Sequence, residues 1–197
     1  MSKSVLNVGG GSKAIAIPAH YADWRHDLLD IDPAAGPDIV ADARDLHRLP
    51  GGTYDAIYCS HNLEHYHRHE GAVVVRGFAH MLKPDGFVEV RVPDMRAVMR
   101  TVVTANLDID DVLYESSLGP ILVRDVLYGW HVEIEKNDNP YFIHKTGFFA
   151  ETLCKFMAAN GFPHNACGTH QFEIIGFFFK QLPTPEQLTL LRLKRTD

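Results

Sequence analysis

Apolar residues fall in short runs separated by glycines, prolines and polar turns, a pattern that predicts strands alternating with helices. The first run, 5–8, leads directly into three consecutive glycines, which predicts a buried strand that ends in a glycine-rich turn. Similar runs predict further strands at 28–33, 37–43, 54–61, 87–93 and 172–180. We therefore expect an α/β fold with an open parallel sheet.

Helical spacing of apolar residues appears between these strands. It predicts a helix at 63–82, followed by a stop and turn at 83–86, and a helix at 148–160 with Gly161 as its C-cap. The remaining predictions are helices at 95–105, 121–127 and within 188–193, and a polar loop at 133–141. Pro18 interrupts the stretch after the glycine turn, so we expect an irregular connection there in place of a crossover helix.

The glycine turn predicts a site for a nucleotide or nucleoside. Without Cβ atoms, Gly9, Gly10 and Gly11 can take positive φ and bring backbone N–H groups close to a ligand. The run from Gly9 to Ala14 also fits the pattern G-x-G-x-x-A, so the turn alone does not separate a nicotinamide dinucleotide from S-adenosylmethionine. A tight turn without a ligand is the plain structural alternative.

Polar residues lie at the carboxyl ends of the predicted strands. Asp30 lies about twenty residues beyond the glycines, where a carboxylate can accept hydrogen bonds from both ribose hydroxyls, and Asp32 competes for that role. The alternative is that both acids only solvate the turn that follows. Because ligands bind at the carboxyl ends of parallel strands, we expect one crevice that gathers the glycine turn, Asp30, Asp42, Ser60 and His61.

Composition and charge exclude several classes of protein. The chain has 197 residues, which suits a single domain, and a formal net charge of -6, which does not suit a large nucleic-acid interface. The sequence contains no apolar run long enough to span a membrane and no charged leader, so we expect a cytoplasmic protein without a membrane partner. Cys59, Cys154 and Cys167 form no C-x-x-C pair, which argues against a disulfide framework and a structural zinc site, and Cys59 is expected in the core.

Taken together, these segments resemble a class I S-adenosylmethionine-dependent methyltransferase of the type 11 kind. The matching runs in the first half are VLNVGGG (5–11), LDID (29–32), VADARDL (40–46), YDAIYCSHNLEH (54–65), LKPDGF (82–87) and VPD (92–94). The second half is similar to one bacterial subgroup of these proteins at LYGW (127–130), YFIHKTGF (141–148) and ANGF (159–162). The resemblance therefore covers nearly the whole chain.

The resemblance implies a Rossmann-like fold. Its seven-stranded, mostly parallel sheet would have helices on both faces and 172–180 as an antiparallel last strand. It also implies one methyltransferase domain at 1–182, within which an insert at 94–145 forms an acceptor lid, and a C-terminal tail at 183–197. Because the chain starts almost at its first strand, without the N-terminal helices that cover the acceptor in many relatives, we expect the insert or a partner subunit to supply the acceptor pocket.

S-adenosylmethionine is the cofactor that the resemblance implies. The glycine turn would hold its methionine portion and Asp30 its ribose, while Asp42 with Ala43 would hold the adenine. The expected cofactor-binding residues are Asn7, Gly9, Gly10, Gly11, Asp30, Ile31, Asp42, Ala43, Ser60 and His61, the last two on the methionine side. Asn7 stands where the family usually has an acid, and Lys13 stands where it has a third glycine. If that acid supports the cofactor ammonium, its loss weakens binding by about 1–2 kcal/mol.

A protonated oxygen or nitrogen acceptor also needs a base. His61, at a strand end beside the cofactor, and His144, in the second-half motif, are the expected candidates because imidazole titrates near neutral pH. Glu64 and His65 can instead hold the start of a helix in place. His65 and His69 lie four positions apart on a helix and could pair as metal ligands, but no third ligand is evident, so we expect no metal.

The sequence thus predicts a methyltransferase that acts on a small-molecule or saccharide-like acceptor. A non-catalytic S-adenosylmethionine-binding scaffold or regulatory subunit is the alternative, favoured by Asn7. The glycine pattern alone supports a third class, a nicotinamide-linked dehydrogenase. Tail leucines and an exposed lid leave a homodimer open. The aromatic candidates for an acceptor pocket are Tyr21, Trp24, Tyr128, Trp130, Tyr141 and Phe142.

Overall fold

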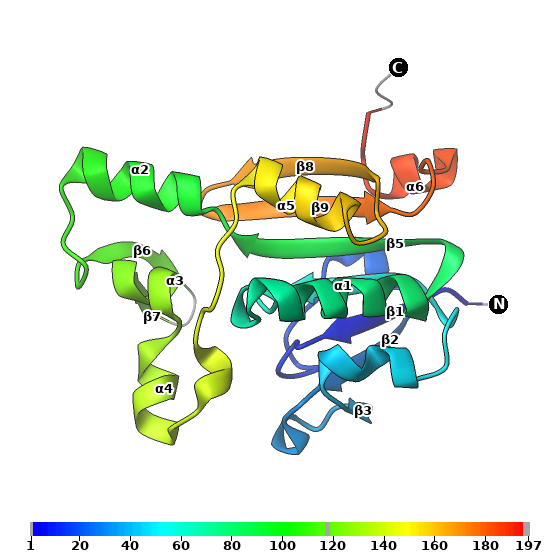
Figure 1. The fold of residues 1–197 in the computed structure, drawn as a ribbon, viewed down its shortest axis with the longest axis horizontal. Coiled ribbons are helices and arrows are strands. Elements are labelled where there is room, and N and C mark those ends of the chain that lie inside the picture. Colours follow the sequence, from blue (N-terminus) through cyan, green and yellow to red (C-terminus); the bar gives the residue numbers. More distant parts are fainter. Residues whose placement is uncertain (1, 117–118, 195–197) are drawn as a thin grey trace.

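A central sheet organises the protein, whose computed structural model describes residues 2–116 and 119–194 (Figure 1). Its strand order is β3-β2-β1-β4-β5-β9-β8. The bounds of these strands are Ser4–Val8 (β1), Arg25–Asp30 (β2), Ile39–Val40 (β3), Tyr54–Ser60 (β4), Leu82–Pro93 (β5), His164–His170 (β8) and Glu173–Phe179 (β9). All neighbouring pairs from β3 to β5 are parallel, and β9 runs antiparallel between β5 and β8. The expected sheet with an antiparallel last strand is confirmed.

The sequence pattern missed β8, because its residues HNACGTH show no alternation of apolar and polar positions. This strand lies at the edge of the sheet and is hydrogen-bonded to β9 alone among the sheet strands, so it buries little apolar surface. The turn predicted at 83–86 is a bulge inside β5, since Tyr54 pairs with Leu82 and Ala56 pairs with Phe87. The predicted third strand, 37–43, shrinks to the two residues of β3.

One face of the sheet is covered by α1 (Arg68–Met81), α5 (Ala150–Ala158) and the 3-10 helix η3 (Ala43–Arg48). Alternate strand residues such as Leu6, Ile57 and Val88 point into this core, as the period of two requires. Cys59 is fully buried there, as expected. Gly161 is not the C-cap of α5: Ala159 takes that position, and Gly161 follows with a φ of 109°.

The opposite face has a second, smaller core. Val5, Ala56 and Phe87 of the strands pack there against Tyr21 of the 3-10 helix η1 (Ala19–Tyr21). Leu191, directly after α6 (Pro185–Leu190), completes this core, so the tail packs onto the sheet. The short η1 is the irregular connection expected after the glycine turn, because Pro18 stands where a crossover helix would begin.

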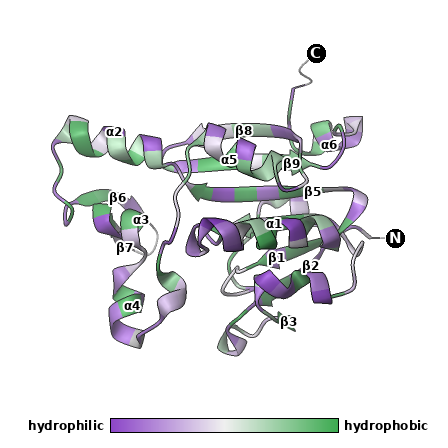
Figure 2. Ribbon diagram, viewed as in Figure 1, coloured by the Kyte–Doolittle hydropathy of each residue, from purple (hydrophilic) through white to green (hydrophobic). Residues whose placement is uncertain are grey.

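Residues 94–116 and 119–145 form an arm beside the sheet (Figure 1). Its elements are α2 (Met95–Ala105), β6 (Val112–Ser116), β7 (Gly119–Leu122), α3 (Val123–Tyr128), α4 (His131–Asn137) and the 3-10 helix η5 (Pro140–Phe142). Val98, Leu113, Val123 and Val126 give the arm a core of its own. The polar loop predicted at 133–141 was wrong in its first half, which is helical: α4 is mostly hydrophilic (Figure 2) and lacks the apolar stripe that the pattern requires.

Among the described residues, none of the helices combines the length and the apolar character that crossing a membrane requires.

Candidate functional site

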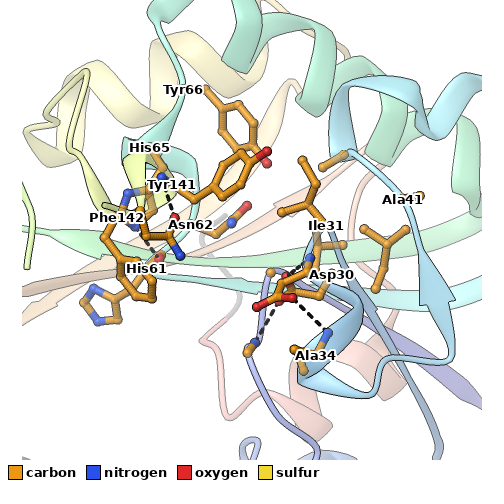
Figure 3. Close-up of a pocket in the computed structure, with 18 residues that line it drawn as sticks. Asp30, Ile31, Ala34, Ala41, His61, Asn62, His65, Tyr66, Tyr141 and Phe142 are labelled. Atoms are coloured by element: carbon orange, nitrogen blue, oxygen red, sulfur yellow. Dashed lines mark hydrogen bonds between the residues drawn. The ribbon is translucent and has the colours of Figure 1, made fainter. Parts of the chain in front are cut away.

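A cavity of about 360 Å³ opens where β1, β2 and β4 end, at the carboxyl edge of the sheet. Figure 3 shows Asp30, Ile31 and Ala34 on one side, and His61, Asn62 and His65 on the other with two aromatic side chains from the arm. This volume lies in the range typical of small-molecule sites. The cavity is therefore the crevice in which the sequence places a ligand.

The glycine turn forms the floor of this cavity. Gly9 and Gly11 have φ angles of 70° and 66°, which side chains rarely adopt. A Cβ on Gly9 would lie 2.1 Å from Nδ2 of Asn62, so glycine is required there for space as well. The Gly9 N–H donates to the Leu29 carbonyl at 2.8 Å, which ties the turn to β2.

Asp30, the last residue of β2, binds the glycine turn. Its Oδ2 accepts a hydrogen bond from the Gly11 N–H at 3.0 Å, and its Oδ1 accepts one from the Asp32 N–H at 3.0 Å. Each carboxylate oxygen can accept a further hydrogen bond, because it has a second lone pair. Asp32 instead caps the 3-10 helix η2 (Pro33–Ala35) by accepting from the Ala34 N–H at 2.8 Å. The two acids line the cavity together, and Asp30 is the one joined to the glycine turn.

Asn7 lies beneath the turn. It is 2% exposed, and its Oδ1 has no hydrogen-bond partner. A Cβ on Gly10 would lie 2.2 Å from its Nδ2, so the second glycine makes room for this side chain. Neither Asn7 nor Gly10 lines the cavity. Asn7 therefore supports the turn from below, and Gly10 is the residue of the turn that packs against it.

Ile31, after β2, and Ala43, at the start of η3, also line the cavity. Ala43 was expected at the adenine together with Asp42. Asp42 borders a smaller neighbouring hollow, and it caps η3 by accepting from the Arg44 N–H at 2.8 Å. Burial alone raises the pKa of Asp42, but hydrogen bonds from Arg44 outweigh burial and lower the pKa below its usual value. The Asp42 carboxylate is therefore hydrogen-bonded to Arg44 and does not line the main cavity.

His61 lies at the methionine end of the expected site, between two carboxylates. Its Nε2 lies 3.0 Å from Oε1 of Glu173, and its Nδ1 lies 3.4 Å from Oε1 of Glu64. Burial lowers the pKa of His61, but its contacts with Glu173 and Glu64 outweigh burial and raise the pKa to about 10. At neutral pH the ring carries its proton already, so this arrangement does not suit the base role that the sequence suggested for His61.

The other expected base, His144, does not line the cavity. Its Nδ1 donates to the Val126 carbonyl at 2.9 Å, and its ring stacks edge-on against His65, with the ring centroids 4.8 Å apart. Ser60, half-buried at the end of β4, also lies outside the lining. Of the expected site residues, the cavity brings together Gly9, Gly11, Asp30, Ile31, Ala43 and His61.

Several residues of the lining were not predicted as cofactor-binding. Asn62 lies two residues after β4, and this position at a strand end could have indicated it. Tyr66 comes after the next 3-10 helix, so its position in the chain gave no such signal. Tyr141 and Phe142, two of the predicted pocket aromatics, reach the cavity from η5 of the arm. Tyr21 does not, because it packs in the core on the opposite face of the sheet.

The cavity fits S-adenosylmethionine. Its floor of glycines leaves space that a Cβ would fill, and a carboxylate with spare acceptor capacity stands beside it, as a ribose diol requires.

Comparisons with known proteins agree with this fit. A family model described as a methyltransferase domain matches residues 1–163. An S-adenosylmethionine-dependent methyltransferase from Archaeoglobus fulgidus has a similar structure, with a TM-score of 0.57 and 13% identity over 91% of this chain and 86% of that chain. Magnesium protoporphyrin IX methyltransferase from Synechocystis PCC 6803, solved with bound S-adenosylhomocysteine, gives a TM-score of 0.54 and 16% identity over 91% and 75% of the two chains. No curated protein matches in sequence.

The family match decides between the cofactors that the glycine pattern left open, in favour of S-adenosylmethionine over a nicotinamide dinucleotide. The chain therefore belongs to the methyltransferase-domain family of class I S-adenosylmethionine-dependent methyltransferases, and S-adenosylmethionine is its cofactor.

Proposed function

We propose that this protein transfers a methyl group from S-adenosylmethionine to a small-molecule or saccharide-like acceptor. The observation that carries the proposal is the cavity of about 360 Å³, bounded by the glycine turn and Asp30 on one side and by the arm on the other. Tyr141 and Phe142 of the arm border it with mixed aromatic and polar surface, which suits a small acceptor better than a polymer. Residues 94–145 then act as the acceptor lid.

The cofactor would lie along the carboxyl edge of the sheet. Gly9 and Gly11 would face its methionine portion, Asp30 its ribose hydroxyls, and Ile31 with Ala43 its adenine. The remaining expected residues, Asn7, Gly10, Asp42 and Ser60, would act by holding this lining in place. When bound, the cofactor supplies an electrophilic methyl group on a sulfonium.

His61 would shape the methionine end of the site. Its backbone is left-handed, with a φ of 47°, and its ring is anchored to Glu64 and Glu173. Methyl transfer is an in-line displacement that depends mainly on alignment of acceptor and methyl group. A ring fixed at both nitrogens can provide such alignment, and we therefore assign His61 to orientation and not to proton removal.

The cofactor site can be tested by isothermal titration with S-adenosylmethionine and S-adenosylhomocysteine. Asp30→Ala should weaken binding by about 30-fold or more, since two hydrogen bonds to a charged group are worth at least about 2 kcal/mol together. Asp45→Ala is the matched control, because Asp45 pairs with Arg48 at 3.3 Å and does not line the cavity. Equal affinity of the wild type and Asp30→Ala would refute the assigned site.

Turnover separates the proposal from its alternative. Incubation with isotope-labelled S-adenosylmethionine and panels of hydroxylated, amino and saccharide acceptors should transfer label to one class. A non-catalytic scaffold is the second candidate, because His61 carries its proton at neutral pH and His144 does not line the cavity. Tight binding without transfer to any class would support the scaffold.

A further inference from the structure

We infer that Glu64, His65 and His144 form a site for a divalent transition-metal ion. Each of the three offers one ligand atom, and these atoms all lie within 4.8 Å of one another. Glu64 and His65 belong to the 3-10 helix η4 (Leu63–His65) that follows β4, whereas His144 belongs to the segment that returns from the arm. The site does not depend on the proposed acceptor, because its evidence is the ligand geometry alone.

The buried carboxylate of Glu64 lacks hydrogen-bond donors. Glu64 is 1% exposed, and neither of its oxygens accepts a hydrogen bond. Its Oε1 lies 3.4 Å from Nδ1 of the His61 ring, and burying a carboxylate without hydrogen bonds is costly. A metal ion bound to the carboxylate would supply the direct bond that its oxygens lack.

Backbone carbonyls orient both histidines. The Nδ1–H of His144 donates to the Val126 carbonyl at 2.9 Å, which leaves Nε2 with a free lone pair. The Nδ1 of His65 lies 3.2 Å from the Ile143 carbonyl, and its Nε2 lies 3.2 Å from the His61 carbonyl. A neutral ring can donate to only one of these oxygens, so its other nitrogen points a lone pair at the second carbonyl oxygen and makes no hydrogen bond there. To bind the ion, this nitrogen would have to turn away from that carbonyl. Histidine ligands in metal sites are oriented in this way, by donating the second ring N–H to a carbonyl.

The donor set indicates which ion would bind. Two imidazole nitrogens and one carboxylate suit zinc and iron(II), whereas calcium and magnesium prefer sites made of oxygen. The sequence suggested His65 with His69 as the ligand pair, but His69 is exposed on α1 and is not in the cluster. His144 and Glu64 take its place, because the arm folds back against η4.

The ion would fasten the arm to the sheet beside the cofactor cavity. The Lys145 and Thr146 N–H groups already donate to the Glu64 carbonyl, at 2.8 and 3.2 Å. His65 lines the cavity together with Tyr141 and Phe142, which lie just before His144 in the chain. Metal binding should therefore stabilise the protein and hold these aromatic residues in position.

The test is titration of the chelator-treated protein with zinc chloride, followed by calorimetry and by the melting temperature. We expect one equivalent to bind and the melting temperature to rise. His144→Gln and Glu64→Gln should each weaken binding by at least about 100-fold, beyond the loss typical of residues that only orient ligands. His69→Ala is the matched control and should bind zinc like the wild type.

Cobalt(II) keeps the test decisive if a variant does not fold. Cobalt bound by two histidines and a carboxylate should give the wild-type protein visible d–d absorption that zinc abolishes. Absence of stoichiometric binding in the wild type would overturn the inference. It would also be overturned if folded His144→Gln or Glu64→Gln variants bound the metal as tightly as the wild type. Loss of metal binding in His69→Ala would overturn it as well, because the ion would then be bound by exposed histidines.

Discussion

Replacing Gly10 with alanine is expected to destabilise the fold by about 1–3 kcal/mol, the cost typical of overpacking a well-packed site. The new Cβ would lie 2.2 Å from Nδ2 of Asn7 and 2.6 Å from its Cγ and Oδ1. Asn7 is 2% exposed and belongs to β1, so its side chain cannot turn to solvent. Gly10 does not have a positive φ, so the expected cost is steric and not conformational.

A double-mutant cycle isolates this contact. In an Asn7→Ala background the clashing atoms are absent, so Gly10→Ala should cost little there, and the coupling energy should be about 1–3 kcal/mol. Gly11→Ala is the control: nothing lies within 4 Å of its Cβ, and its φ of 66° imposes a strain that does not depend on residue 7. That strain costs about 1–2 kcal/mol in both backgrounds.

The measurement is urea unfolding followed by circular dichroism for the wild type, both single variants and the double variant. An unchanged dependence of the unfolding free energy on urea would show that the denatured state is unaffected. Costs of Gly10→Ala and Asn7→Ala that add within about 0.5 kcal/mol would refute the reasoning, because residues in contact should couple. Titration with S-adenosylmethionine would show whether displacing Asn7 also weakens cofactor binding.

Three further predictions concern stability and oxidation. Phe162→Ala should lower the unfolding free energy by about 3–5 kcal/mol in urea, because the ring is fully buried. Hydrogen bonds from Lys83 and Ser4 outweigh burial and lower the pKa of Asp55. The charged Asp55 carboxylate therefore stabilises the fold at neutral pH, and this contribution is lost as the pH falls through the lowered pKa. Asp55→Asn should reduce the acid sensitivity of the melting temperature, measured at several pH values. Cys154 and Cys167, whose Sγ atoms lie 2.8 Å apart, should exchange with oxidised glutathione to form a disulfide, with a mass loss of two hydrogens, while buried Cys59 stays reduced.

Much of the sheet and one side of the cavity could be predicted from sequence, because both depend on local signals. The run before the glycines predicted β1, and the acid at the end of the next run predicted Asp30 beside the turn. Edge strand β8 and helix α4 could not be predicted in this way, since neither has an apolar stripe. The base role suggested for His61 did not suit the structure, because position in the chain does not reveal that Glu173 pairs with its ring.

The sequence by itself determined the parallel strands that lead to the cavity, the glycine turn, and the family to which the protein belongs. These follow from residue type and spacing within short segments, which act through backbone conformation and burial. Only the tertiary structure decided the charge of His61 and the grouping of Glu64, His65 and His144. The physical reason is that a charge or a ligand set depends on distances between side chains, and folding brings these together from segments far apart in the chain.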